Sequence, residues 1–138
     1  MIQLIKTILS GVVVFVFCQA LLEHVIAPMK KIKELRGDVA RLLVMYANVL
    51  SNPVNELRDA YPRYRECEDK FREIAANLKE FRSCNSKLFY IRYDLETAAK
   101  GLIGLSNSLF YHTREDKYEC IKRTERYLDD VKKALKLS

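Results

Sequence analysis

An apolar stretch without charged side chains near the N-terminus constrains this chain more than any other feature. Residues 7–22 have the sequence TILSGVVVFVFCQALL. As a helix with a rise of about 1.5 Å per residue the stretch is about 24 Å long, and four further residues bring it to about 30 Å, the thickness of a hydrocarbon core. Glu23 and His24 then lie at the interface, where an ionised group costs far less than at the bilayer centre. The sequence therefore predicts a transmembrane anchor at residues 1–28, with residues 7–26 in contact with membrane lipid.

A cleaved signal peptide is the alternative interpretation of the same stretch. Lys6 precedes a rather short apolar run, and residues 18–20 (CQA) form an acceptable cleavage site. The basic residues after the run favour the anchor instead, because basic residues close to a membrane end resist translocation. These are Lys30, Lys31, Lys33, Arg36 and Arg41. We therefore expect a single-pass membrane protein whose C-terminal part faces the cytoplasm.

The net charge of +6 belongs to residues 29–138, because Lys6 and Glu23 balance each other in the anchor. Such an excess of bases favours anionic partners, which include lipid headgroups, acidic proteins and nucleic acids. A membrane-anchored chain already lies beside anionic lipid. Nucleic acid is the least favoured of these partners, because the sequence contains no recognised nucleic-acid-binding motif.

The cysteines are scattered along the chain, at Cys18, Cys67, Cys84 and Cys120. Since no two form a C-x-x-C pair, they indicate neither a zinc site nor a thioredoxin-type redox site. Three lie outside the anchor, and an odd number fits a reducing compartment better than a disulfide framework.

Within the anchor, Cys18 is a candidate for lipidation, and Thr7 and Gly11 have the spacing that lets two membrane helices pack closely. Both patterns are common by chance.

Beyond the anchor the sequence has the periodicity of helices, and we expect no strands. The expected helices cover residues 30–50, 53–81, 87–111 and 114–137. Their short connections favour antiparallel neighbours. The predicted fold class is therefore all-α, with one N-terminal transmembrane helix followed by an antiparallel four-helix bundle in residues 29–138.

The second expected helix has a cap and an interruption. Asn52 is suited to cap it, and Pro53 is suited to its first position, where a missing N–H has no partner in any case. Pro62 should kink this helix or divide it in two. The first turns of the third expected helix could instead form a separate short helix or loop.

Apolar residues at three- and four-residue spacing define the face that each helix should bury. In the first helix they are Val39, Leu42, Leu43, Tyr46, Val49 and Leu50. In the second they include Leu57, Tyr64, Cys67, Phe71, Ile74, Leu78 and Phe81. In the third they include Leu95, Ala98, Leu102, Ile103, Leu109 and Phe110. In the fourth they are Tyr118, Ile121, Leu128, Val131 and Leu135.

Two stretches place amides and hydroxyls beside these apolar faces: residues 46–53 (YANVLSNP) and 101–110 (GLIGLSNSLF). A buried amide without a partner costs about 1–3 kcal/mol, so these groups must find partners. In a structural interpretation Asn48, Ser106 and Asn107 join helices by hydrogen bonds. In a functional interpretation they line a polar groove for a small ligand or a partner peptide. The candidate binding residues are Asn48, Asn52, Arg58, Arg63, Ser106 and Asn107.

The glycines of the second stretch also indicate close packing. Gly101 and Gly104 cost about 1 kcal/mol each inside a helix. They are tolerable where another backbone or a ligand approaches closely.

The same two stretches resemble a family of small bacterial membrane-anchored helical proteins of unestablished function. In that family an apolar N-terminus leads into a basic segment, followed by a YANVxSNP-like motif and later by an LIGLSNS-like motif. The resemblance covers most of the chain, although Leu50 stands where the family often has tyrosine. It implies a bacterial membrane-anchored helical protein and implies no activity. We therefore expect a single-pass protein of the bacterial inner membrane.

We expect no catalytic site, no metal site and no cofactor, because the motifs of metalloproteases, di-iron bundles, nucleotide-binding loops and serine hydrolases are missing from the sequence. The first functional hypothesis is a membrane-tethered interaction or scaffold module that binds a protein partner or another copy of itself. The alternative is a small membrane effector, for example in bacterial defence, whose cytoplasmic bundle senses a signal and alters membrane integrity. The polar anchor residues Gln19, Glu23 and His24 motivate this alternative.

Overall fold

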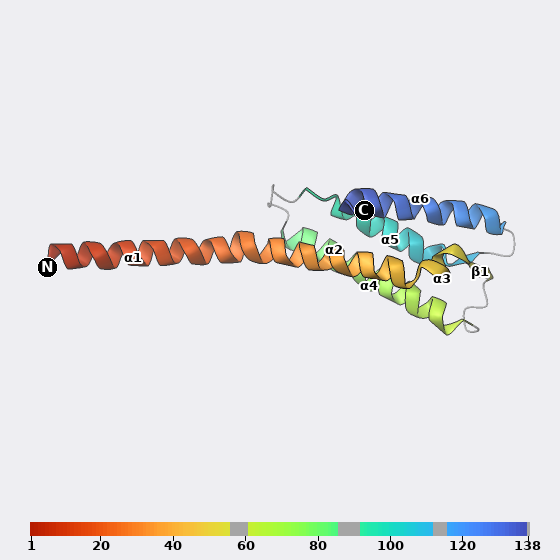
Figure 1. The fold of residues 1–138 in the computed structure, drawn as a ribbon, viewed down its shortest axis with the longest axis horizontal. Coiled ribbons are helices and arrows are strands. Elements are labelled where there is room, and N and C mark those ends of the chain that lie inside the picture. Colours follow the sequence, from red (N-terminus) through yellow and green to blue (C-terminus); the bar gives the residue numbers. More distant parts are fainter. Residues whose placement is uncertain (56–60, 86–91, 112–115, 138) are drawn as a thin grey trace. The chain divides into compact units, whose positions relative to one another are not determined.

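The computed structural model describes residues 1–55, 61–85, 92–111 and 116–137 (Figure 1). The regular elements of the described chain are helices, apart from two strands of two residues each. It divides into two compact units, residues 1–34 and 35–138. The expected all-helical fold class with an N-terminal apolar helix is confirmed.

The N-terminal unit is built on α1 (Ile2–Leu21), which passes through a π-helical turn, η1 (Leu22–Ile26), into α2 (Ala27–Met45). By length and composition, this continuous run of helix contains one segment that can cross a membrane. No residue of α1 is buried, so its apolar side chains are all exposed. The π turn ends two residues before Pro28, which has no N–H for the helical ladder. At its C-terminal end the Ala27 N–H donates to the Leu22 carbonyl, five residues earlier.

The C-terminal unit contains the end of α2 and all later elements. These are α3 (Ala47–Ser51), β1 (Val54–Asn55), α4 (Pro62–Cys84), α5 (Leu95–Asn107), β2 (Phe110–Tyr111) and α6 (Lys117–Leu135). Helix α5 lies between α4 and α6 and packs against both, while α3 contacts α6 (Figure 1). This arrangement places α5 at the centre of the unit.

The expected start of the second helix at Pro53 is wrong, because α4 begins at Pro62. A proline ring disfavours helical conformation in the residue before it, and Tyr61 is accordingly non-helical at φ −129° and ψ 73°. Asn52 does not cap a following helix as expected; it lies at the C-terminal end of α3. Part of the expected helix, residues 56–60, lies outside the described residues.

The expectation of no strands is also wrong. Strands β1 and β2 pair in parallel, with Val54 opposite Phe110, and the Val54 N–H donates to the Leu109 carbonyl at 3.1 Å. Strands of two residues are too short to leave an alternating pattern in the sequence. Their pairing brings the ends of the two polar stretches together.

Most of the predicted buried faces are confirmed. All six predicted residues of the first helix are buried, as are Cys67, Phe71, Leu78 and Leu102 at the centre of the unit. The prediction is wrong for Tyr118, which is 67% exposed. Ile121 and Leu128 on α6 are only half-buried.

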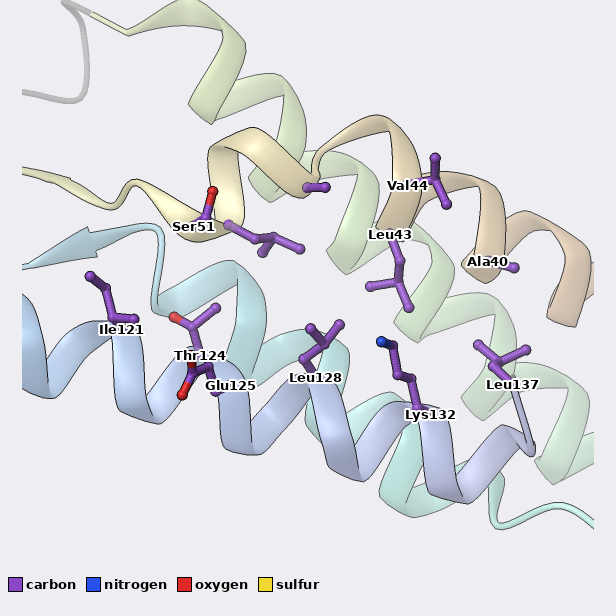
Figure 2. A pocket seen from close by; sticks show the side chains of 12 residues that line it. Ala40, Leu43, Val44, Ser51, Ile121, Thr124, Glu125, Leu128, Lys132 and Leu137 are labelled. Carbon is purple, nitrogen blue, oxygen red and sulfur yellow. The ribbon is translucent and has the colours of Figure 1, made fainter.

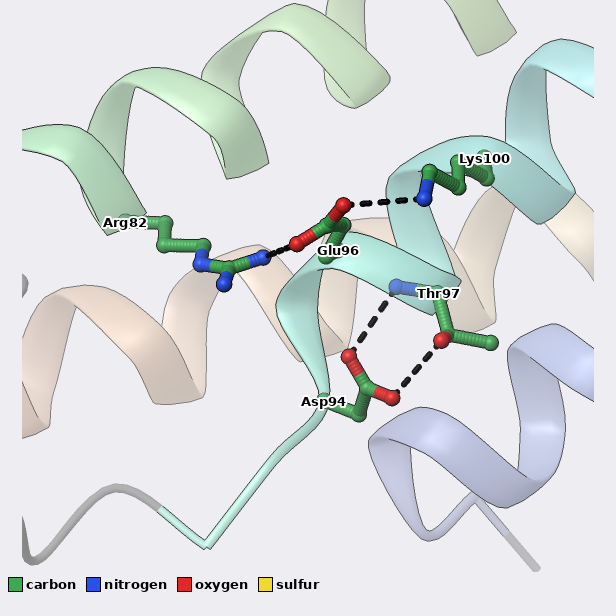
Figure 3. Close-up of polar contacts among 5 residues, drawn as sticks. All are labelled: Arg82, Asp94, Glu96, Thr97 and Lys100. Atoms are coloured by element: carbon green, nitrogen blue, oxygen red, sulfur yellow. Dashed lines mark hydrogen bonds and ion pairs between the residues drawn. The ribbon is translucent and has the colours of Figure 1, made fainter.

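Helices α5 and α6 begin later than expected because an aspartate caps each of them. Asp94 Oδ1 accepts a hydrogen bond from the Thr97 N–H at 3.0 Å, and Thr97 Oγ1 donates to Asp94 Oδ2 at 2.6 Å (Figure 3). Glu96, in the first turn of α5, pairs with Arg82 of α4 and with Lys100 one turn later. Asp116 caps α6 by accepting from the Tyr118 N–H. Residues 86–91 and 112–115 of the expected helices lie outside the described residues.

The cap of α5 should make a contribution to stability that depends on pH. The two bonds from Thr97 lower the pKa of Asp94 below its ordinary value. Asp94→Ala should therefore lower the free energy of unfolding by about 1 kcal/mol near neutral pH. The pKa of Asp94 is lower in the folded state than in the unfolded state. The difference in free energy of unfolding between the two proteins should therefore shrink as the pH falls through the folded-state pKa, because both states then bind the proton.

Urea titrations of the two proteins between pH 3 and 7 measure this difference. Asp94→Asn is the matched control, because asparagine also caps a helix but does not titrate. A difference between wild type and Asp94→Ala that stays constant with pH would contradict the prediction.

Candidate binding groove

Ser106 and Asn107 are held by one arginine of the neighbouring helix. Arg72 of α4 donates from Nε to Ser106 Oγ at 3.4 Å and from Nη2 to Asn107 Oδ1 at 3.1 Å. Its Nη2 also pairs with Glu68 Oε1 at 2.7 Å, and the Glu68 side chain is only 6% exposed. These bonds join α4 to α5, as the structural interpretation of the two residues predicts.

Asn48 and Asn52 form a separate local set on α3. Asn52 Nδ2 donates to the Asn48 carbonyl at 3.1 Å, and the Tyr64 hydroxyl donates to the Asn52 carbonyl at 2.6 Å. In the described parts of the chain, no hydrogen bond links these asparagines to Ser106 or Asn107. Among the described candidate residues, the two asparagines of residues 46–53 and the pair Ser106–Asn107 therefore form two separate hydrogen-bonded sets.

Of the two arginines in the predicted set, the structure describes one. Arg63 lies exposed in the first turn of α4. Arg58 lies outside the described residues.

Two cysteines of the C-terminal unit, Cys67 and Cys120, are buried. The Cys120 thiol donates to the Ser108 carbonyl at 3.1 Å, and Arg123 Nε donates to Ser108 Oγ at 3.3 Å, which ties α6 to the end of α5. Burial raises the pKa of the Cys67 thiol to about 12. Since the thiolate is the nucleophile, Cys67 stays unreactive at neutral pH.

A groove of about 510 Å³ lies between α2–α3 and α6 and is a candidate for binding (Figure 2). Residues of α2 and α3 line one wall: Ala40, Leu43, Val44, Ala47, Leu50 and Ser51. Leu137 and five residues of α6 line the other: Ile121, Thr124, Glu125, Leu128 and Lys132. We call this feature the α2–α6 groove. Its volume is within the range of small-molecule pockets and its lining is mainly apolar.

The groove explains why two predicted core residues of α6 are not fully buried. Ile121 and Leu128 face the groove, where α6 and α2 do not close against each other (Figure 2). Val44 on the opposite wall is 79% exposed. Apolar side chains gathered at an open groove mark a surface that is suited to binding.

Two opposite charges belong to the α6 wall. Glu125 and Lys132 are both exposed, and neither forms an ion pair with the residues that the structure describes. Lys132 extends from α6 toward α2 across the groove (Figure 2). By contrast the adjacent Lys133 pairs with Asp129 at 2.6 Å, which raises the pKa of the lysine.

Sequence reasoning missed the charged residues of this groove. Ile121, Glu125, Leu128 and Lys132 follow one another at spacings of four, three and four residues, which places all of them on one stripe of α6. The signal available in the sequence was the pair of charges within this otherwise apolar stripe.

The groove has no features of a metal site. Within the described ranges of the chain, no group of three or more His, Cys, Asp or Glu side chains could hold a metal ion.

Comparison of the chain with protein-family models, with curated proteins and with solved structures found no match.

Proposed function

We propose that the chain is a membrane-tethered interaction module whose helical unit binds a protein partner through the α2–α6 groove. The proposal includes a single span in the bacterial inner membrane and a cytoplasmic C-terminal unit folded as an antiparallel four-helix bundle. The groove is the observation on which it depends, because an open apolar surface next to unpaired charges is suited to a protein partner.

The composition of the groove favours binding over catalysis. Its titratable side chains are Glu125 and Lys132. They are seven residues apart on α6, which is two helical turns or about 10 Å. An acid and a base that act on one reacting group must both be within hydrogen-bond reach of it, and this separation is too large. The groove therefore supports an interaction module rather than an enzyme.

The polar residues of the anchor do not favour the alternative of a membrane effector. Gln19 Nε2 donates to Glu23 Oε1 at 2.6 Å, and His24 Nδ1 lies 3.1 Å from the Ala20 carbonyl oxygen. These side chains thus have partners in their own helix. We therefore propose the interaction module as the function.

Reporter fusions to the C-terminus of the full chain test the tether and its orientation. Green fluorescent protein fused there should fluoresce in bacterial cells, and alkaline phosphatase fused there should be inactive, because the C-terminal unit stays in the cytoplasm. The full chain should remain in the membrane fraction after an alkaline wash. Deleting residues 1–28 should move the protein to the soluble fraction with its helical circular dichroism retained.

The opposite pattern would overturn the proposal. An active phosphatase fusion together with a mature chain that begins near Leu21 would show a cleaved leader and an exported protein. A truncated protein that aggregates without helical structure would show that the C-terminal unit does not fold by itself.

A further inference from the structure

Helix α6 carries an apolar stripe that its own unit leaves open. Tyr118, Ile121, Glu125, Leu128 and Lys132 are spaced by three, four, three and four residues, the repeat of a helix-packing seam. Tyr118 is 67% exposed, and Ile121 and Leu128 are half-buried. We call these five residues the α6 stripe. The apolar members of this stripe therefore remain partly open to solvent.

The charges of the α6 stripe are complementary to those of a second α6 stripe that runs antiparallel to it. Glu125 lies three residues before Leu128, and Lys132 lies four residues after it. When two copies of α6 pack antiparallel about a two-fold axis near Leu128, Glu125 of each copy lies beside the partner's Lys132. Both ion pairs form at once, and both charges gain the partner that they lack in the described chain.

We infer that the α2–α6 groove binds α6 of a second copy of this chain, in an antiparallel pair with two Glu125–Lys132 contacts. The inference rests on the proposed function and names the partner. Val44 on the opposite wall is 79% exposed and would be covered by the incoming helix.

A lipid chain is a less suitable occupant of the groove. An anionic lipid could pair its headgroup with Lys132, but Glu125 would then lie beside the apolar tail. A carboxylate next to hydrocarbon and without a cation is unfavourable. The second copy satisfies both charges, so the charge pattern favours it.

Charge reversal in the full-length protein tests this inference. Two differently tagged copies are expressed together, extracted from membranes in mild detergent and measured by co-purification, with sedimentation to give the mass of the complex. Glu125→Lys and Lys132→Glu should each reduce self-association at least tenfold, because each places two pairs of like charges in contact. Circular dichroism checks that each variant keeps its helical content.

Combining the variants should restore the complex. A chain with Glu125→Lys mixed with a chain with Lys132→Glu regains two opposite-charge pairs, and so does a chain that carries both substitutions. Both combinations should return to within about threefold of wild type. Lys133→Glu is the matched control: it makes the same change one residue away, outside the α6 stripe, and should leave association within about twofold of wild type.

Three results would overturn the inference. They are a monomeric wild-type protein, single variants that still associate, and combinations that do not recover. A monomer that binds lipid vesicles or a different protein would overturn it as well, while a membrane-fraction protein with a cytoplasmic C-terminus would leave the proposed tether intact. Failure of the inference is thus distinguishable from failure of the proposed function.

Discussion

Replacing Arg72 with methionine should lower the free energy of unfolding by about 2–3 kcal/mol. The Glu68 carboxylate is 6% exposed and pairs with Arg72 at 2.7 Å, so the variant leaves a buried charge without its cation. Breaking a fully buried pair costs about 3–5 kcal/mol. We expect the smaller value because the Arg72 side chain is 51% exposed and water reaches this site. The variant also removes the bonds that hold Ser106 and Asn107.

Urea titration of the full chain in detergent micelles measures this effect. The chain has no tryptophan, so far-UV circular dichroism is the appropriate signal. Lys70→Met is the matched control on the same helix: it removes an exposed pair with Glu73 and should cost less than about 0.5 kcal/mol.

A second substitution tests the cause. Glu68→Gln in the Arg72→Met background should recover part of the loss, because a neutral amide is cheaper to leave buried than a carboxylate. Equal losses in Arg72→Met and Lys70→Met would contradict the prediction.

Gly101→Ala should lower the free energy of unfolding by about 1–3 kcal/mol, although alanine is the better helix former. A Cβ atom at Gly101 would lie 2.5 Å from Val131 Cγ2 and 3.3 Å from the Tyr127 carbonyl oxygen. Val131 is fully buried, and its branched side chain has little rotamer freedom. Helices α5 and α6 must therefore move apart to accept the methyl group.

Gly37→Ala is the matched control, measured by the same titration. Nothing lies within 4 Å of the position of its Cβ atom in α2. This variant should raise the free energy of unfolding by about 0.5–1 kcal/mol, because glycine loses more freedom than alanine in a helix. If both glycine variants shift stability in the same direction, close packing at Gly101 is not the reason for its glycine.

The sequence predicts that a neighbour packs closely against the two glycines of α5, but it does not identify that neighbour. Gly101 and Gly104 inside a helical pattern indicate that something approaches the helix closely. The structure shows that the neighbour is α6, with Val131 against Gly101 and Tyr127 against Gly104. The sequence contains no information on which helix of the unit fills that space.

The sequence by itself determined the features that depend on neighbours along the chain. The apolar helix of α1 follows from a run of uncharged residues, and the buried faces of Val39 or Phe71 follow from helical periodicity. Such features need only local spacing and side-chain type. The helix start at Pro62 rather than Pro53 was not determined in this way, because both prolines suit a first turn.

Only the tertiary structure decided which distant segments meet. Val54 is extended because its N–H bonds to the carbonyl of Leu109, 55 residues later, and Ser106 has its partner on α4 rather than on α3. The α2–α6 groove exists because α6 packs on α5 while its outer stripe stays apart from α2. Contacts of this kind depend on how helices pack in three dimensions, and periodicity fixes the buried face of a helix without fixing which neighbour covers it.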